Sequence, residues 1–476
     1  MLDDKNCLIG MDIGTTGIKA VIVDAEKGFL ASAGREHYYT HIDPVKGYTE
    51  FNTELWWDIT KQIIPEALNR AEVSASEIKG IGISALTPCV TPVDEKGNSL
   101  RNAMIWQDTR TPRHWAPLQQ NNPLFGTGKV LWIKENEPEI YKKTHKFFFN
   151  AESIINAKLT GKFVENNSGN KKKREIIEEQ FNEYNLDVNK IPEYFDSTVI
   201  IGGVTKEAAK EVGLSEGIPV VAGQSDGAGA RIGCRSIREG TAFIMMGHSH
   251  VMGMKGTDGS SSFVTISAAG AIHRWCRELF GQQEVEVANR LGLSAYSLLD
   301  REAERVQPGS NGLMLLPYFM GERAPMWNPN LRGVLFGLDL THDKSHIIRA
   351  ILESCAFGMR YGFESGTGIL KGVKEIGATG GGSGSLLWIE IYASMFGLPF
   401  VRYGSDNTCV GDAIIAGVGC GIYKDIWSGC DKIAKAIEVI EPDQEWKKVY
   451  DRYYKIYKEI YEKLEGTFEE YAKVEK

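Results

Sequence analysis

A short loop between two strand-like runs near the N-terminus constrains the fold more than any other feature of the chain. The apolar run of residues 8–13 contains Asp12, and a Gly/Thr loop follows at residues 14–17. P-loops and dinucleotide-binding loops open into a helix, because a helix N-terminus supplies the positive end that meets phosphate. Residues 18–23 are rich in β-branched side chains, which predicts a second strand. We therefore predict a β-hairpin and exclude both of those loops.

The tip of this hairpin has two possible roles. Its backbone N–H groups and the hydroxyls of Thr15 and Thr16 can cradle a phosphate, while the carboxylate of Asp12 holds a cation. An ordinary hairpin with a turn-forming Asp and Gly fits the same residues. This segment alone leaves both interpretations open.

Length and composition narrow the class of protein. A chain of 476 residues is too long for one core and suits two large domains, with three as the alternative. Its net charge of −8 argues against a nucleic-acid or anionic-membrane partner. The eight cysteines form no C-x-x-C pair, and the sequence has neither a signal-peptide pattern nor a membrane-spanning apolar run. We expect a soluble cytoplasmic protein, with the basic residues 171–174 in a solvated loop.

The first third of the chain predicts a meander that leads into a crossover. A third strand is expected around residues 29–39, and Thr53 is positioned to cap the next helix. That helix carries apolar residues at helical spacing from Leu55 to Leu68 and contains Pro65. Residues 78–84 are typical of a buried strand, so the predicted order is β-β-β-α-β.

A second unit of similar pattern follows far downstream. Residues 240–254 predict another strand–turn–strand, and residues 346–362 predict a helix. A short strand at 375–379 is followed by a glycine turn that opens a helix over 386–396. We expect two α/β domains, 1–245 and 246–476, with a site in the cleft between them. A surface amphipathic helix should span 445–476.

Asp226 is the strongest candidate for a catalytic group. It ends a short apolar strand and precedes a helix of small residues. One interpretation is a helix N-cap, a common role for Asp after a strand. The other is a general base at the carboxyl end of a strand, where open α/β sheets bind their ligands. From this segment alone the N-cap is the stronger interpretation.

Two further segments have the composition of ligand sites. Trp106 and Asp108 suit a polyol, because the ring can cover a C–H face while the acid accepts hydroxyl hydrogen bonds. A buried Trp beside a surface Asp–Arg pair is the alternative. The glycines at 380–382 allow a backbone to lie flat against adenine, or simply make a tight turn. The histidine pairs at 248/250 and 342/346 lack a third ligand and predict no metal site.

Taken together, these segments resemble the FGGY carbohydrate kinase family, which has an actin-like, ribonuclease-H-like ATPase fold. The resemblance runs nearly end to end and rests on several motifs in order. Residues 12–16 resemble the family's first phosphate hairpin, 106–110 its W-x-D-x-R, 157–161 its LTG, 223–226 its G-x-x-D, 380–399 its signature, and 411–413 its G-A-A helix.

The resemblance implies a role for each candidate residue, with ATP and Mg²⁺ as cofactors. Asp226 would be the catalytic base and, with Asp12, a metal-side carboxylate. The implied nucleotide contacts are Gly14, Thr15, Thr16, Gly247, Ser249, Gly380, Gly381, Gly382 and Ser383. The implied sugar contacts are Thr87, Trp106, Asp108 and Asp226.

The motif at 317–333 is similar to that of the xylulokinase branch, so we expect ATP-dependent phosphorylation of a ketopentose such as xylulose. A homodimer is expected at the level of the family. The chain departs from the branch at three places: residues 85–88 replace a G-Q-M-H run, His248 replaces the Thr of a G-T-S turn, and 165–184 lack an Asp-Tyr-Ser stretch. An actin-like ATP-binding switch, an impaired regulatory protein, and a kinase for another sugar or polyol remain alternatives.

Overall fold

The structure is a computed structural model that describes residues 6–37, 40–43, 47–108, 110, 125–167, 169–255, 261–367, 370 and 372–474. Two compact units are present. The first combines residues up to 233 with residues 406–435, and the second combines residues 234–405 with those from 436 onward. This division differs from the expected single boundary near 245, because a helix late in the chain completes the first unit.

The first unit is built on a seven-stranded mixed sheet in the order β12-β13-β6-β1-β2-β3, with β14 also paired to β6. Strands β1 (Cys7–Ile13), β2 (Gly17–Asp24) and β3 (Gly28–Glu36) form an antiparallel meander. β6 (Ile78–Ala85) runs parallel to β1. β13 (Pro219–Val221) and β14 (Gln224–Ser225) run parallel to β6, and β12 (Ile200–Gly203) closes the edge. The predicted hairpin and crossover are confirmed.

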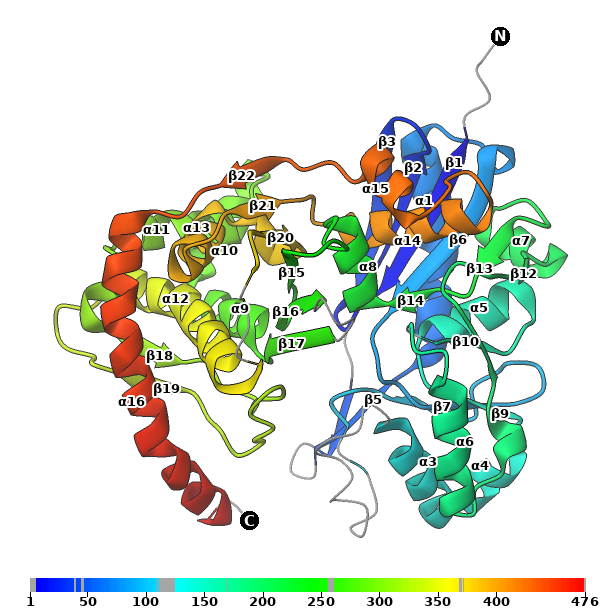
Figure 1. Cartoon of the computed structure of the whole chain (residues 1–476), viewed down its shortest axis with the longest axis horizontal. Coiled ribbons are helices and arrows are strands. Elements are labelled where there is room, and N and C mark those ends of the chain that lie inside the picture. Colours follow the sequence, from blue (N-terminus) through cyan, green and yellow to red (C-terminus); the bar gives the residue numbers. More distant parts are fainter. Residues whose placement is uncertain are drawn as a thin grey trace. The chain divides into compact units, whose positions relative to one another are not determined.

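Helices from distant parts of the chain cover this sheet (Figure 1). α1 (Thr53–Ala71) buries Trp56, Ile59 and Ile63 and continues through Pro65. Its N-cap is Asn52, whose side chain accepts from the Glu54 N–H, so the cap lies one residue before the predicted Thr53.

α14 (Asn407–Gly419), drawn in orange beside the blue strands in Figure 1, packs closely on β1 and β6. A Cβ on Gly10 would lie 1.7 Å from the Cys409 carbonyl oxygen, and one on Gly82 would lie 2.1 Å from that of Asp412. Only glycine permits this approach between helix and sheet. Residues 406–435 therefore belong to the first unit.

The second unit repeats the pairing pattern of the first. Its six-stranded sheet has the order β17-β16-β15-β20-β21-β22. β15 (Thr241–Met246), β16 (His250–Lys255) and β17 (Ser261–Ile266) form the meander. β20 (Glu375–Thr379) and β21 (Phe400–Arg402) add in parallel, and β22 (Glu438–Ile440) adds antiparallel. The predicted similarity of the two units is confirmed at the level of strand order.

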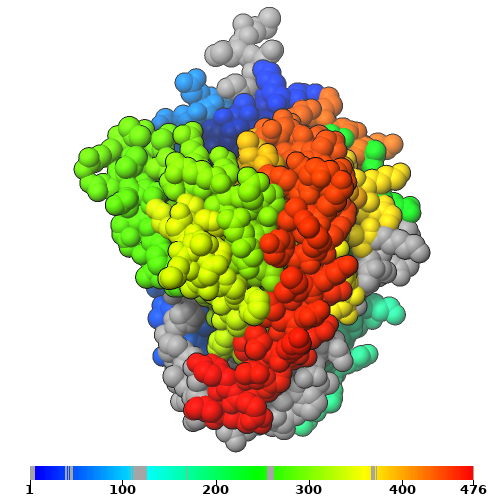
Figure 2. Space-filling model, turned by 90° about the vertical axis from the view of Figure 1, so that its left-hand side faces the viewer, coloured from blue at the N-terminus to red at the C-terminus, as the bar shows by residue number. Residues whose placement is uncertain are grey.

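The helices of the second unit also follow the predicted pattern. α12 (Lys344–Gly362) and α13 (Leu386–Phe396) enclose the core, and α9 (Ala269–Phe280) packs against α12. The C-terminal α16 (Gln444–Val474) lies along the surface in red in Figure 2 and buries one stripe that includes Tyr450, Tyr454 and Tyr457. This confirms the amphipathic helix through residue 474. Among the described helices, none combines the length and the apolar character needed to cross a membrane.

The remaining elements are short. In the first unit they are β4 (Thr40–Asp43), β5 (Tyr48–Phe51), η1 (Ala75–Glu77), β7 (Thr91–Val93), β8 (Ala103–Met104), α3 (Phe125–Asn136), α4 (Pro138–Lys143), β9 (Lys146–Phe148), α5 (Glu152–Thr160), β10 (Val164–Asn166), α6 (Lys173–Glu183), η3 (Val188–Lys190), β11 (Glu193–Phe195), α7 (Lys206–Val212), α8 (Asp226–Gly233) and α15 (Ile426–Ile433). In the second they are α10 (Gln282–Leu291), α11 (Ala295–Glu304), η4 (Ser310–Gly312), β18 (Met314–Leu316), β19 (Val334–Phe336), η5 (Phe363–Thr367) and η6 (Gly381–Gly384).

The basic run at 171–174 is only partly the solvated loop that we expected. Lys171 and Lys172 are exposed. Lys173 begins α6, donates to the Asn166 carbonyl at 3.3 Å and faces the buried carboxyl groups of Glu152 and Glu165. Burial lowers the pKa of Lys173, although both glutamates act in the opposite direction. The prediction is therefore wrong for Lys173, because acidic side chains from α5 and β10 draw its ammonium inward.

Candidate active site

Three neighbouring strands of the first unit bring polar side chains into one row. Asp12 on β1 is in register with Ser84 on β6, and Ser84 is in register with Gln224 on β14. These strands are parallel, so their carboxyl ends lie at one edge of the sheet. Ligands bind at this edge in open α/β sheets. The predicted Asp12 and Asp226 are thus brought together with two residues that the sequence did not single out.

The hairpin tip follows directly after Asp12. The Gly14 N–H closes the turn by donating to the Gly17 carbonyl at 2.9 Å, so this predicted phosphate donor is used within the hairpin. Thr15 and Thr16 form the half-buried tip, and the Thr16 carbonyl accepts from the His37 N–H at 3.0 Å. The hydroxyls of Thr15 and Thr16 are therefore the groups of this tip that can face a ligand.

The half-buried carboxyl of Asp12 lies in the field of a second acid. Burial and the charge of Asp226 raise the pKa of Asp12 to about 7, while the Ser84 hydroxyl and Lys19 act to lower it. Lys19 pairs with Asp12 in the β1–β2 register and forms an ion pair with Asp406 at 2.8 Å. Two neighbouring carboxylates repel each other, so a cation between them would be favourable.

This pair of acids fits the expected magnesium ion. Mg²⁺ usually takes one or two carboxylates and completes its shell with waters and substrate phosphates. Within the part of the chain that the structure describes, no group of three or more His, Cys, Asp or Glu side chains is arranged to hold a metal ion. Asp12 and Asp226 therefore suit an ion that is shared with a nucleotide better than one enclosed by protein.

Asp226 is the first residue of α8 and follows the carboxyl end of β14. The Ala228 N–H donates to Ser225 Oγ at 3.3 Å, so Ser225 provides the side-chain cap three residues along. Asp226 Oδ1 accepts from the adjacent Gly227 N–H at 2.7 Å, which is not the N2 or N3 contact of a helix cap. Ser225, and not Asp226, is therefore the N-cap of α8.

A third acid, Asp412 on α14, lies beneath the same row of side chains and was not predicted. It is fully buried, with Oδ1 2.9 Å from Gln224 Nε2 and Oδ2 2.8 Å from Ser84 Oγ. Burial, reinforced by Asp12, raises the pKa of Asp412 well above its ordinary value. Its position 400 residues after Asp12 gave no local signal in the sequence.

Trp106 joins the predicted sugar side to the predicted phosphate side. Its indole Nε1 donates to Thr15 Oγ1 at 3.1 Å. Thr87 is half-buried and follows the end of β6, where the Leu86 N–H donates to the Ile13 carbonyl at 2.9 Å. Thr87 is therefore placed at the same sheet edge as the hairpin tip.

The carboxylate of Asp108 is not exposed to solvent. Its side chain is buried, and its oxygens accept from the Thr49 N–H at 2.7 Å and from Arg110 at distances of 2.6–3.1 Å. Arg110 is equally buried and also pairs with Glu50 at 2.7 Å. The expected Asp–Arg pair exists, but it is internal rather than on the surface. The carboxylate of Asp108 is thus engaged by protein donors at both oxygens, and its contact with a sugar hydroxyl stays a prediction.

In the second unit, the predicted turn at residues 247–249 lies against the start of α9. The Ala271 N–H donates to the His248 carbonyl at 3.0 Å, and a Cβ on Gly270 would lie 2.2 Å from the Gly247 carbonyl oxygen. Ser249 is half-buried, and its carbonyl accepts from the Gly247 N–H at 3.1 Å.

Two arginines that the sequence did not single out lie near this turn. Burial, Arg274 and Arg323 lower the pKa of His248 to about 4, so the imidazole is neutral at physiological pH. Their guanidinium groups bring positive charge toward His248, although Arg274 also lies 3.9 Å from Glu278 and Arg323 adjoins the buried Glu322. The turn therefore suits an anion although His248 replaces the expected Thr.

The predicted adenine turn follows β20. Gly380 adopts φ +90°, and a Cβ there would meet the Met246 backbone at 2.9 Å. Gly381 is exposed and has no heavy atom within 4 Å of its Cβ position, so its backbone can be approached closely. Ser383 is buried and donates to the Gly380 carbonyl at 2.7 Å, so its hydroxyl stabilises the turn, and its contact with the nucleotide stays a prediction. Gly381 is therefore the residue of the turn best placed for a planar ligand, since a Cβ on Gly382 would lie 3.0 Å from the Met246 side chain.

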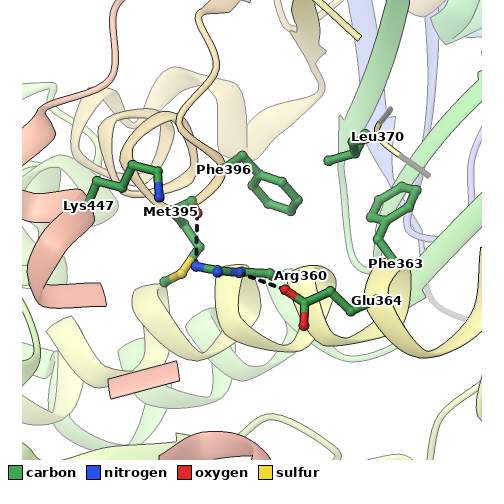
Figure 3. A pocket seen from close by; sticks show the side chains of 7 residues that line it. All are labelled: Arg360, Phe363, Glu364, Leu370, Met395, Phe396 and Lys447. Carbon is green, nitrogen blue, oxygen red and sulfur yellow. Dashed lines mark hydrogen bonds and ion pairs between the residues drawn. The ribbon is translucent and has the colours of Figure 1, made fainter. Parts of the chain in front are cut away.

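A separate pocket of about 250 Å³ in the second unit contains none of the predicted residues (Figure 3). Its two cations are already paired. Arg360 contacts Glu364 at 3.2 Å and Asp451 at 2.6 Å, and Lys447 contacts Asp451 at 2.7 Å. The apolar part of its lining consists of Phe363, Leu370, Met395 and Phe396. We assign no role to this pocket.

The chain is similar to known sugar kinases over nearly its whole length. A xylulose kinase from Staphylococcus epidermidis is 27% identical, and the match covers 96% of this chain and 97% of that protein. A gluconokinase from Bacillus subtilis is 28% identical over 86% of each chain. The crystal structure of xylulose kinase from Rhodospirillum rubrum superposes with a TM-score of 0.78 at 25% identity, covering 97% of this chain and all of that one.

The family assignment rests on both parts of the chain. Residues 7–233 match the N-terminal domain of the FGGY family of carbohydrate kinases, and residues 220–420 match its C-terminal domain. These kinases use ATP and transfer a phosphoryl group to a sugar hydroxyl. The predicted family, its fold and its class of reaction are thus confirmed, and the chain belongs to the FGGY family of carbohydrate kinases.

Proposed function

We propose that this kinase phosphorylates a neutral ketopentose such as xylulose, with Asp226 as the general base. The observation that carries the assignment of the base is the position of Asp226. It begins α8 at the carboxyl ends of parallel strands, while Ser225 takes over the capping role. A carboxylate held there can accept a proton from a substrate hydroxyl.

Phosphoryl transfer depends mainly on positioning and on neutralising charge. Asp226 would accept the hydroxyl proton as the phosphoryl group is transferred. Asp12 would hold Mg²⁺ with the help of Asp226, and the bound ion would neutralise charge on the β- and γ-phosphates. Thr15 and Thr16 are the proposed phosphate contacts of the first unit.

The proposed nucleotide contacts of the second unit are Gly247, Ser249 and the backbone of residues 380–382. Arg274 and Arg323 add positive charge near the first of these turns. The buried Ser383 would shape the glycine turn rather than touch adenine.

The charges around Trp106 favour a neutral sugar over a sugar acid. Within the part of this region that the structure describes, the buried side chains of Arg110 and Lys129 are both engaged by protein groups. Arg110 is paired with Asp108 and Glu50, and Lys129 donates to the Asp108 carbonyl at 2.6 Å. Burial lowers the pKa of Lys129 to about 8, which further weakens it as a fixed positive charge. A sugar carboxylate would instead meet the field of Asp12 and Asp226.

The test of the substrate is ADP release across D-xylulose, D-ribulose, gluconate and glycerol. Strong stimulation by a ketopentose supports the proposal. Greatest stimulation by gluconate would overturn the neutral-sugar argument. Slow hydrolysis that no sugar stimulates would favour the ATP-binding switch, and no turnover would favour an impaired regulatory protein.

The test of the base is Asp226→Asn, compared with Ser225→Ala. Removing the base should lower kcat about 100-fold or more, while ATP still binds in calorimetry. Ser225→Ala removes a helix cap and should lower stability by about 1 kcal/mol with a smaller effect on kcat. Turnover of Asp226→Asn close to that of the unmodified enzyme would rule out Asp226 as the base.

A further inference from the structure

The proposed mechanism gives no role to Asp412, an acidic residue whose side chain is fully buried. It lies on α14 under the row formed by Asp12, Ser84 and Gln224, and no part of its side chain reaches solvent. Burying an unpaired carboxylate is costly, so its environment has to explain it. Among the residues that the structure describes, its side-chain hydrogen bonds are with Ser84 and Gln224, and none is with a cation.

The number of available protons decides which hydrogen bonds Ser84 can form with Asp12 and Asp412. Ser84 Oγ lies 3.1 Å from Asp12 Oδ1 and 2.8 Å from Asp412 Oδ2. A hydroxyl has one proton and can donate to only one carboxylate. If both acids were ionised, one of these contacts would place two acceptors against each other. One of the two carboxyl groups must therefore contribute a proton.

We assign that proton to Asp412 and not to Asp12. Its Oδ1 accepts from Gln224 Nε2 at 2.9 Å, which leaves Oδ2 as the oxygen that can be protonated. Asp12 is half-buried and lies near Lys19, whereas Asp412 is fully enclosed. Asp412 Oδ2–H then donates to Ser84 Oγ, and the Ser84 hydroxyl donates to Asp12 Oδ1. Each hydrogen bond in the series Asp412–Ser84–Asp12 then has one donor and one acceptor.

We propose that Asp412 is a neutral positioning residue that, through Ser84, fixes the orientation of the Asp12 carboxylate. With Oδ1 held by Ser84, Oδ2 of Asp12 is turned toward the hairpin tip, where it lies 3.7 Å from the Cβ position of Gly14. The inference rests on the proposed function, in which Asp12 is the carboxylate on the metal side. Asp412 acts on that carboxylate without touching substrate or ion.

The test compares four variants. Asp412→Leu keeps the number of side-chain heavy atoms but removes the donor, and Ser84→Ala removes the hydroxyl that links Asp412 to Asp12. Each should raise the Mg²⁺ concentration for half-maximal activity about tenfold, the effect of one hydrogen bond to a charged group. Asp412→Asn can donate from Nδ2 to Ser84 and accept from Gln224, so it should restore the Mg²⁺ dependence. Thr60→Val, which removes a buried hydroxyl in α1, is the matched control and should leave that dependence unchanged.

A second measurement does not depend on activity. At pH 9, where Asp12 with its pKa of about 7 is ionised, infrared spectra of protein with isotope-labelled aspartate should still contain the C=O stretch of a protonated carboxylic acid, and Asp412→Asn should remove it. If Asp412→Leu does not fold, Ser84→Ala and the infrared band still decide the question. The proposal is overturned if Asp412→Asn loses activity as severely as Asp226→Asn, or if the band is absent. Failure of the proposed function would appear separately, as unchanged turnover in Asp226→Asn.

Discussion

Trp106 Nε1 donates a hydrogen bond to Thr15 Oγ1 at 3.1 Å. One of these residues is predicted to contact the sugar and the other a phosphate. Because the bond connects them within one unit, a substitution of Trp106 should also alter the position of Thr15 at the hairpin tip.

Trp106→Phe should therefore alter the KM for both substrates. The variant keeps an aromatic face but loses the N–H donor, and one such bond contributes about 1 kcal/mol, or roughly fivefold in affinity. Thr15→Val should have a similar effect on ATP, whereas Thr15→Ser should restore it. Steady-state kinetics with each substrate varied in turn measures this. A change confined to the sugar KM would show that the bond does not connect the two contacts.

Asp108→Asn should reduce stability more than it reduces sugar affinity. The carboxylate of Asp108 is buried against Arg110 and the Thr49 N–H, and weakening a buried charge pair costs about 1–3 kcal/mol. Urea unfolding and the sugar KM measured on the same preparation separate the two effects. A raised sugar KM at unchanged stability would mean that Asp108 binds the sugar directly.

Gly82→Ala should disrupt the packing of α14 on β6. The new Cβ would lie 2.1 Å from the Asp412 carbonyl oxygen, so helix and strand would have to separate, and overpacking of this kind costs about 1–3 kcal/mol or more. Gly227→Ala is a matched control for stability, because no heavy atom lies within 4 Å of its Cβ position. The thermal midpoint should fall for the first variant and be maintained or raised in the second.

Stability should decline as the pH falls below 6.5, in part because of His250. Burial, with a smaller contribution from His273, lowers the pKa of His250 from 6.5 to about 3. Between these values the unfolded chain binds a proton that the folded state does not, so acid favours unfolding. At pH 5 this amounts to about 2 kcal/mol, from 1.36 kcal/mol per pH unit.

The matching variant is His250→Gln, which does not titrate. Urea unfolding midpoints at pH 7.5 and pH 5 should differ less for this variant than for the unmodified protein. The variant also changes the contact that His250 Nδ1 makes with the Tyr392 hydroxyl at 2.8 Å, so the comparison is of pH dependence and not of absolute stability. An equal pH dependence in both proteins would contradict the prediction.

Local patterns in the sequence were sufficient for the hairpin, the meander and α12, because each depends on residues within one short window. The same patterns could not place Asp412, whose partners Ser84 and Gln224 are 328 and 188 residues away. The internal partners of Asp108 were missed for a related reason. Its type suits a polyol, but the Thr49 N–H, 59 residues earlier, occupies the carboxylate. Contacts set by tertiary packing lie outside what spacing along the chain can report.

The position of residues 406–435 in the first unit has a consequence for how the protein is made. During synthesis, the strands that contain Gly10 and Gly82 emerge from the ribosome long before the helix that covers them. Until then, one face of the N-terminal sheet has no partner from its own chain. Maturation of the first unit must therefore wait until residues 406–435 have been synthesised, and a fragment that ends at residue 405 would expose that face to chaperones and to aggregation.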